Sequence, residues 1–174
     1  MDYSNNYLVI DLETTGFSPV YNEIVELSAV RFVNCEPADV YTTLIRPANG
    51  IRYYASRING ITAEMVENSP YIEEVAKDFI EFIQDDRIIV GHNIRFDLGF
   101  LRANNICIAE DRCEIHDTMR MAQRRLRRGE VKNHRLDTLC RYYGIKNKKA
   151  HRGVSDCLAT GYLYAELVRD MSAL

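Results

Sequence analysis

The sequence lacks the features that mark membrane, secreted and disulfide-stabilised proteins. No apolar run approaches the roughly 18 residues that a membrane span needs. The first residues are polar and carry no basic segment ahead of an apolar one, so we expect no secretory signal. The five cysteines are odd in number and form no C-x-x-C pair, which favours reduced, buried thiols over a disulfide framework or a zinc site. We therefore expect a cytoplasmic protein without a membrane partner.

Internal repeats, low-complexity stretches and linkers are also absent. The chain has 174 residues, of which 47% are apolar, so a packed core is expected and disorder is not. This length falls within the usual range for one domain. We expect residues 1–174 to form a single domain.

The net charge of −3 conceals a strongly basic block. Residues 119–152 contain 12 lysines and arginines and only two acids, a local balance of +10, whereas the rest of the chain has 10 bases and 23 acids. Such a concentrated excess favours a polyanionic partner. The alternative is a solvated helix face followed by a loop.

The expected elements indicate an α/β domain built on a mixed sheet. Buried strands are expected at residues 7–12, 23–33, 38–47, 87–93 and 114–118. Six helices are expected. The first follows Thr62 as its N-cap, and the second starts with Pro70 at its first position. The others cover residues 94–105 and 119–126, a segment that ends at Gly144, and Val154 to about Val168. Three strands in succession, then strands alternating with helices, are typical of a central five-stranded mixed sheet flanked by helices.

Four acids and one histidine stand where these strands end and helices begin. Asp11 and Glu13 leave the first strand, and their i, i+2 spacing directs both carboxylates to one side. Asp97 starts the helix after "VGHN", and Asp156 opens the last helix, five residues after His151. Clustered carboxylates need a cation, and hard oxygen ligands suit Mg²⁺ or Mn²⁺ better than zinc. Taken singly, Asp97 and Asp156 are also explained as acids that the helix macrodipole favours at the start of a helix. His151 taken alone is also explained as an ordinary surface or capping residue.

Three segments resemble the motifs of the DEDDh exonucleases, a family typified by the proofreading epsilon subunit of bacterial replicative DNA polymerase. "VIDLETTG" with "IVELSAV" is similar to the first motif, "VGHNIRFDLGFL" to the second and "HRGVSDCLAT" to the third. The shorter segments "INGIT" and "HRLDTLCRYYGI" agree with this family, and the resemblance covers nearly the whole chain.

This resemblance implies a ribonuclease H-like fold, two divalent metal ions (Mg²⁺ or Mn²⁺) and removal of nucleoside monophosphates from a 3′ end. By the same resemblance, His151 is the general base. The metal ligands are Asp11, Glu13, Asp97 and Asp156, and the residues beside the terminal nucleotide are Thr14, Thr15, Gly16 and Asn59.

Two positions depart from the family pattern. Asn59 stands where a histidine is frequent, and we expect altered affinity without loss of activity. Gly153 stands where alanine is more usual, and we expect it to loosen the loop that carries His151.

Two further residues near the second motif are candidates for substrate contact. Asn93 either binds a backbone phosphate or caps the following helix. Phe96 is a candidate for stacking on a base, as are Tyr53 and Tyr54.

The leading hypothesis is an exonuclease that acts on the 3′ end of single-stranded DNA, with a DNA polymerase as a possible partner. The second is a small RNA trimmer resembling oligoribonuclease or ribonuclease T. A phosphatase of the haloacid dehalogenase type, read from "DLET", leaves His151 and Asp156 unexplained. A silent nucleic-acid or polymerase-binding module is the non-enzymatic alternative, although none of the expected acids is missing.

Overall fold

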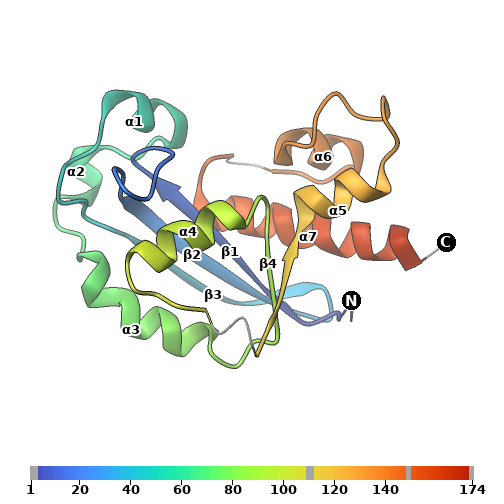
Figure 1. The fold of residues 1–174 in the computed structure, drawn as a ribbon, viewed down its shortest axis with the longest axis horizontal. Coiled ribbons are helices and arrows are strands. Elements are labelled where there is room, and N and C mark those ends of the chain that lie inside the picture. Colours follow the sequence, from blue (N-terminus) through green and yellow to red (C-terminus); the bar gives the residue numbers. More distant parts are fainter. Residues whose placement is uncertain (1–3, 109–111, 148–149, 173–174) are drawn as a thin grey trace.

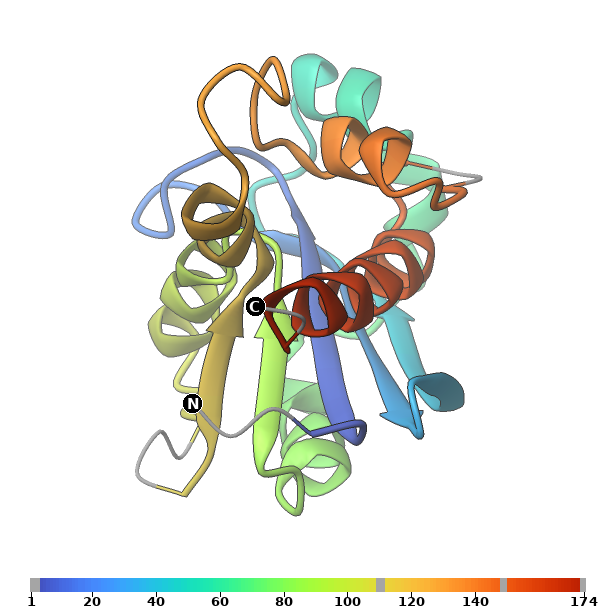
Figure 2. The same cartoon turned by 90° about the vertical axis from the view of Figure 1, so that its right-hand side faces the viewer.

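A five-stranded mixed sheet forms the centre of the computed structural model, which describes residues 4–108, 112–147 and 150–172. Its strands are β1 (Tyr7–Thr14), β2 (Ile24–Val33), β3 (Glu36–Leu44), β4 (Ile88–Gly91) and β5 (Glu114–Asp117). They are arranged in the order β3-β2-β1-β4-β5 (Figures 1 and 2). β2 pairs antiparallel with both β1 and β3, whereas β4 pairs parallel with both β1 and β5. The expected fold class is confirmed.

Helices cover both faces of this sheet. In the described residues they are α1 (Tyr53–Asn59), α2 (Ala63–Val66), α3 (Ile72–Ile83), α4 (Arg95–Ala103), α5 (Thr118–Arg125), α6 (Leu136–Tyr142) and α7 (Gly153–Ser172). One apolar cluster joins the sheet to α3 and α4, and a second joins it to α5, α6 and α7 (Figure 1). No helix in the described part of the chain is both long enough and apolar enough to span a membrane.

The alternation of side chains along β1 decides where its two acids emerge. Leu8 and Ile10 belong to the cluster beneath α3 and α4, whereas Val9 belongs to the cluster beneath α7. Because alternate residues of a strand share a face, Asp11 and Glu13 continue the series of Val9. Both acids therefore emerge on the α7 side, at the end of the strand.

A row of small residues lets α7 lie directly on β1 and β2. Gly153, Cys157 and Gly161 recur at every fourth position and so share one helix face. A β-carbon on Gly153 would collide with the side chain of Ser28, and one on Gly161 would collide with the ring of Phe32. The close approach of this helix brings its first turn to the end of β1.

Several expected boundaries hold and others are wrong. Thr62 is the N-cap of α2, and Gly144 has a left-handed backbone (φ 71°) after α6, as expected. α3 starts at Ile72 after Tyr71, so Pro70 is not its first residue. β3 covers residues 36–44 instead of 38–47, α7 extends to residue 172, and the helix α1 was not expected.

Candidate active site

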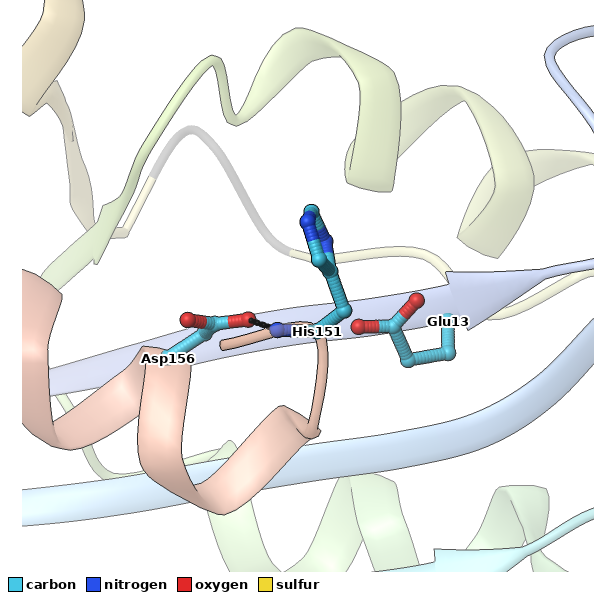
Figure 3. Close-up of side chains that lie close together, drawn as sticks. All are labelled: Glu13, His151 and Asp156. Carbon is cyan, nitrogen blue, oxygen red and sulfur yellow. Dashed lines mark hydrogen bonds between the residues drawn. The ribbon is translucent and has the colours of Figure 1, made fainter. Parts of the chain in front are cut away.

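The residues expected to carry the chemistry come together from β1, α4 and α7. One ligand atom from each of Glu13, His151 and Asp156 lies within 4.8 Å of the other two (Figure 3). Asp97 reaches β1 from α4, where its Oδ1 accepts a hydrogen bond from the backbone N–H of Leu12 at 3.1 Å. The carboxylate of Asp11 is close enough to the other acids for their charges to raise its pKa. The structure thus places all five predicted residues in one cluster.

Burial and mutual repulsion make the ionised form of these acids unfavourable. Burial is the main cause in each case, and it raises the pKa of Asp11 well above its usual range. It also raises the pKa of Glu13 to about 8, with contributions from the charges of Asp156 and Glu26. The pKa of Asp97 is likewise raised to about 8. Such a cluster is stabilised in its ionised form by a bound cation.

The donor set fits a hard divalent cation. Glu13 and Asp156 offer carboxylate oxygens and His151 a ring nitrogen to the group that could hold an ion, and Asp11 and Asp97 add carboxylate oxygens beside it. Oxygen ligands suit Mg²⁺ or Mn²⁺. No cysteine belongs to the group of possible ligands found in that part of the chain. The residues present therefore agree with the expected metal ions.

Asp156, one of the acids of the cluster, also holds the loop before α7 through hydrogen bonds. Asp156 accepts a hydrogen bond from the backbone N–H of His151 at 2.7 Å through Oδ2 and from Asn147 Nδ2 at 2.5 Å through Oδ1. Asn147 Oδ1 in turn accepts from Ser155 Oγ at 2.9 Å. His151 has a left-handed backbone (φ 63°), a conformation that costs a non-glycine residue about 1–2 kcal/mol. These bonds keep the strained residue in place.

The expected effect of Gly153 is wrong, because this glycine lies in the helix and not in a loose loop. Its backbone N–H donates to Glu26 Oε2 at 3.0 Å, and Arg152 Nη2 contacts Glu26 Oε1 at 3.2 Å. Gly153 is buried, and Ser28 occupies the space that an alanine side chain would need. Gly153 therefore tightens the contact between α7 and β2.

A hollow of about 220 Å³ opens beside the cluster. Among the predicted residues, Glu13, Thr14, Gly16, Asn59, Phe96 and His151 line it. The helix α1 contributes Tyr54 and Ile58, which are 44% and 51% exposed. The size and the mixed lining suit one nucleotide, with apolar surfaces available to a base.

Asn59 has most of its polar atoms engaged by the protein. Its Nδ2 donates to the carbonyl of Thr14 at 3.4 Å, and its Oδ1 accepts from the backbone N–H of Ile61 at 3.0 Å. A side-chain hydrogen bond from Asn59 also lowers the pKa of Glu13, although burial of that acid outweighs it. Asn59 thus joins α1 to the end of β1.

Two predicted substrate residues lie outside the hollow. Thr15 is buried, and its Oγ1 accepts from the backbone N–H of Glu23 at 3.0 Å, so it stabilises the turn after β1. Asn93 is exposed and has a left-handed backbone (φ 64°). It does not cap α4, whose N-cap is Ile94 and has no side-chain capping bond.

The basic block, residues 119–152, includes most of α5, the whole of α6 and His151, which belongs to the cluster. Its ion pairs include Arg120–Asp117, Arg125–Asp170 and Arg152–Glu26. Seven cationic side chains have no ion pair with a described residue: Arg124, Arg127, Arg128, Lys132, Arg135, Arg141 and Lys146. Lys148 and Lys149 lie outside the described residues.

Sequence reasoning did not find three residues that shape the site. Glu26 lies within the first motif, but only the fold shows that it binds the start of α7. Asn147 gives no sequence signal, because its partners lie eight and nine residues further along. Phe17, which lines the hollow, is 81% exposed and resembles an ordinary turn residue.

Comparison with known proteins assigns the chain to a family. The RNase T family model, described as exonuclease, matches residues 8–164, and the chain belongs to this family of exonucleases. The relatives include a PolC-type DNA polymerase III of Oceanobacillus iheyensis, 37% identical over 169 residues, and its counterpart in Bacillus subtilis, 36% identical over 167. The matches cover 96% and 94% of this chain but only 12% and 11% of the relatives. The exonuclease assignment removes the phosphatase alternative.

Solved structures agree with this assignment. Exonuclease X in complex with 5′ overhanging duplex DNA has a TM-score of 0.76 and 26% identity, over 97% of this chain and 93% of its own. A zinc-bound complex of Escherichia coli exonuclease I with single-stranded DNA has a TM-score of 0.80 at 21% identity, over 98% of this chain and 42% of its own, and so supports the fold alone.

Proposed function

We propose that this exonuclease domain, formed by residues 1–174, removes nucleoside monophosphates from the 3′ end of single-stranded DNA with the help of two Mg²⁺ or Mn²⁺ ions. The observation that carries the proposal is the cluster of mutually repelling carboxylates, two buried and two half-buried, beside a hollow of about 220 Å³. Asp11, Glu13, Asp97 and Asp156 would hold the ions. The ions would activate water and neutralise charge on the scissile phosphate.

The protein groups divide the remaining work. The side chain of His151, which is exposed at the edge of the cluster, would accept the proton of the attacking water on a ring nitrogen. Thr14, Gly16, Asn59 and Phe96 would position the terminal nucleotide in the hollow. Thr15 would support this arrangement from behind, and Asn93 would contact the strand outside the hollow.

The relatives favour DNA as the substrate and a polymerase as a partner. They are named as DNA polymerases, and this chain corresponds to about 12% of their length. We infer a role in proofreading during DNA replication, in which the domain works beside a polymerase. Co-purification with the replicative polymerase of the host tests the association independently of cleavage.

The decisive experiment is a time course on 5′-labelled single-stranded DNA and RNA of equal length, with Mn²⁺, Mg²⁺ or EDTA. We expect a ladder that shortens from the 3′ end, requires the metal and forms faster on DNA. Faster shortening of RNA would favour the RNA trimmer. The absence of cleavage of either polymer by folded protein would favour the silent binding module.

A further inference from the structure

A groove of about 540 Å³ lies between α4, the edge strand β5 and the first turn of α5. The floor of the groove contains Ile94 and Leu98 of α4, which are almost fully buried, and the half-buried Ile115 of the edge strand β5. Arg95 and Arg102 line the groove from α4, seven residues apart on one helix face, and Arg120 lines it from the first turn of α5.

Among the described residues, Asp117 is the one acid in the lining of this groove, and its Oδ2 lies 3.7 Å from Arg120 Nε. The other carboxylate oxygen of Asp117 accepts hydrogen bonds from the backbone N–H groups of Asn93 and Met119, at 3.1 and 3.0 Å. Arg95 is exposed and makes no ion pair with a described residue. Arg95 thus faces this groove without a counter-ion among the described residues, and the carboxylate of Asp117 is already engaged.

The groove and the hollow are both lined by residues from the first turn of α4. Phe96 lines the hollow together with Glu13 and His151, whereas its neighbour Arg95 lines the groove. Asn93, immediately before this turn, is exposed. The start of α4, which follows the end of β4 (Figure 1), therefore lies between the hollow and the groove.

We propose that this groove binds the phosphodiester backbone of the same strand, on the 5′ side of the scissile bond. The proposal rests on the proposed exonuclease function and adds the path of the substrate. One guanidinium group can donate two parallel hydrogen bonds to the oxygens of a phosphate. Arginine is therefore better suited than lysine to hold a phosphodiester backbone in a fixed position. Phosphate contacts position a strand without reading its sequence. Arg95 and Arg120 are binding residues in this scheme.

The test compares the double variant Arg95→Gln/Arg120→Gln with the wild type and with Arg87→Gln. Arg87 is an exposed arginine at the opposite end of β4, so its replacement controls for the loss of positive charge. Two substrates are used with Mn²⁺: a twelve-nucleotide thymidine strand and the p-nitrophenyl ester of thymidine 5′-monophosphate, which has no upstream phosphate. Affinity for the strand is also measured in EDTA over a range of salt concentrations.

We expect the double variant to lower the ratio of kcat/KM for the strand to that for the ester by about tenfold. The slope of log affinity against log salt should fall by about 0.7 for each phosphate contact removed. Arg87→Gln should change neither quantity. Thermal unfolding of each variant shows whether the loss of the Arg120–Asp117 contact has disturbed the fold, and Arg95→Gln alone then provides the measurement.

The outcomes separate this proposal from the function on which it rests. An unchanged ratio and salt slope, or equal losses in Arg87→Gln, would overturn the groove while leaving the exonuclease intact. Failure of the wild type to hydrolyse either substrate would overturn the exonuclease function itself. In that case a salt slope that still depends on Arg95 would show that the groove binds nucleic acid without cleavage.

Discussion

At the scale of single residues, Gly153 and Ser28 limit how closely α7 can approach β2. Because Ser28 fills the space beside Gly153, the change Gly153→Ala should destabilise the protein by about 1–3 kcal/mol, the usual effect of overpacking a rigid contact. Urea unfolding measures this loss. Cleavage should also slow, since the first turn of α7 carries Asp156.

Gly99 provides the matched control for this substitution. It lies within α4, and a β-carbon there would meet only Pro19 Cγ at an ordinary 3.9 Å. Gly99→Ala should therefore stabilise the protein by up to about 1 kcal/mol through helix propensity. In the Gly153→Ala background, Ser28→Gly should restore part of the loss. A stable Gly153→Ala variant would show that α7 can shift away from the sheet.

His151 is the second residue whose role can be separated from its place in the structure. His151→Asn keeps a side chain that tolerates the left-handed backbone, so folding should be preserved. Loss of a general base should lower kcat by about 10²–10⁴-fold. Calorimetric titration with Mn²⁺ should give an unchanged affinity. A large loss of Mn²⁺ affinity would instead identify His151 as a metal ligand.

At the scale of elements, the sequence predicted what depends on local patterns. β1 and α4 have continuous or periodic apolar residues, and their acids were placed correctly at their ends. α1 lacks such a signal, because its buried residues are only Ala55 and Asn59 and its N-cap, Arg52, makes no side-chain capping bond. This helix forms through contacts with the end of β1, which no local pattern encodes.

The loop before α7 depends on contacts of the same kind. Asn147 orients Asp156 through a hydrogen bond that also lowers the pKa of this acid, against the larger effect of burial, which raises it. Asn147→Ala should therefore raise that pKa further and free the carboxylate to rotate. Mn²⁺ affinity should fall by about ten- to hundredfold near neutral pH and recover partly as the pH rises.

Ser155→Ala is the control for this prediction. It removes the other side-chain bond of Asn147 at 2.9 Å and leaves the bond to Asp156 in place. Its Mn²⁺ affinity should stay close to that of the wild type. Equal losses in the two variants, or a loss in Asn147→Ala that does not change with pH, would mean that Asn147 supports the loop in general instead of orienting Asp156.

At the scale of the whole molecule, two opposite concentrations of charge meet at the end of the sheet. The buried acids lie where β1, α4 and α7 converge, and residues 119–152 bring an excess of positive charge to the same region (Figure 2 shows α5, α6 and α7 around this end). The acids repel one another without a cation, whereas the basic segment is suited to a polyanion. Repulsion between these like charges therefore lowers the stability of the fold at the place where metal and nucleic acid are proposed to bind.

This arrangement predicts how stability depends on pH and on metal. Glu13 and Asp97 have pKa values of about 8 in the folded protein, against usual values near 4 for such groups in an unfolded chain. Between these limits the folded state holds protons that the unfolded state has released. Their stabilising contribution is complete below about pH 4 and is lost as the pH rises through about 8. Without metal, the melting temperature should therefore fall across this window.

A divalent cation should reverse the trend, because it binds the ionised acids and must displace their protons. The increase in Tm on adding Mg²⁺ should be small at pH 5, grow towards pH 8 and then level off. Differential scanning fluorimetry at fixed ionic strength measures this directly. In Asp97→Asn the metal-free decline should be shallower, whereas Asp78→Asn, on the exposed face of α3, should follow the wild type. A metal effect that is largest at pH 5 would contradict the raised pKa values and, with them, the assignment of these acids as a cation site.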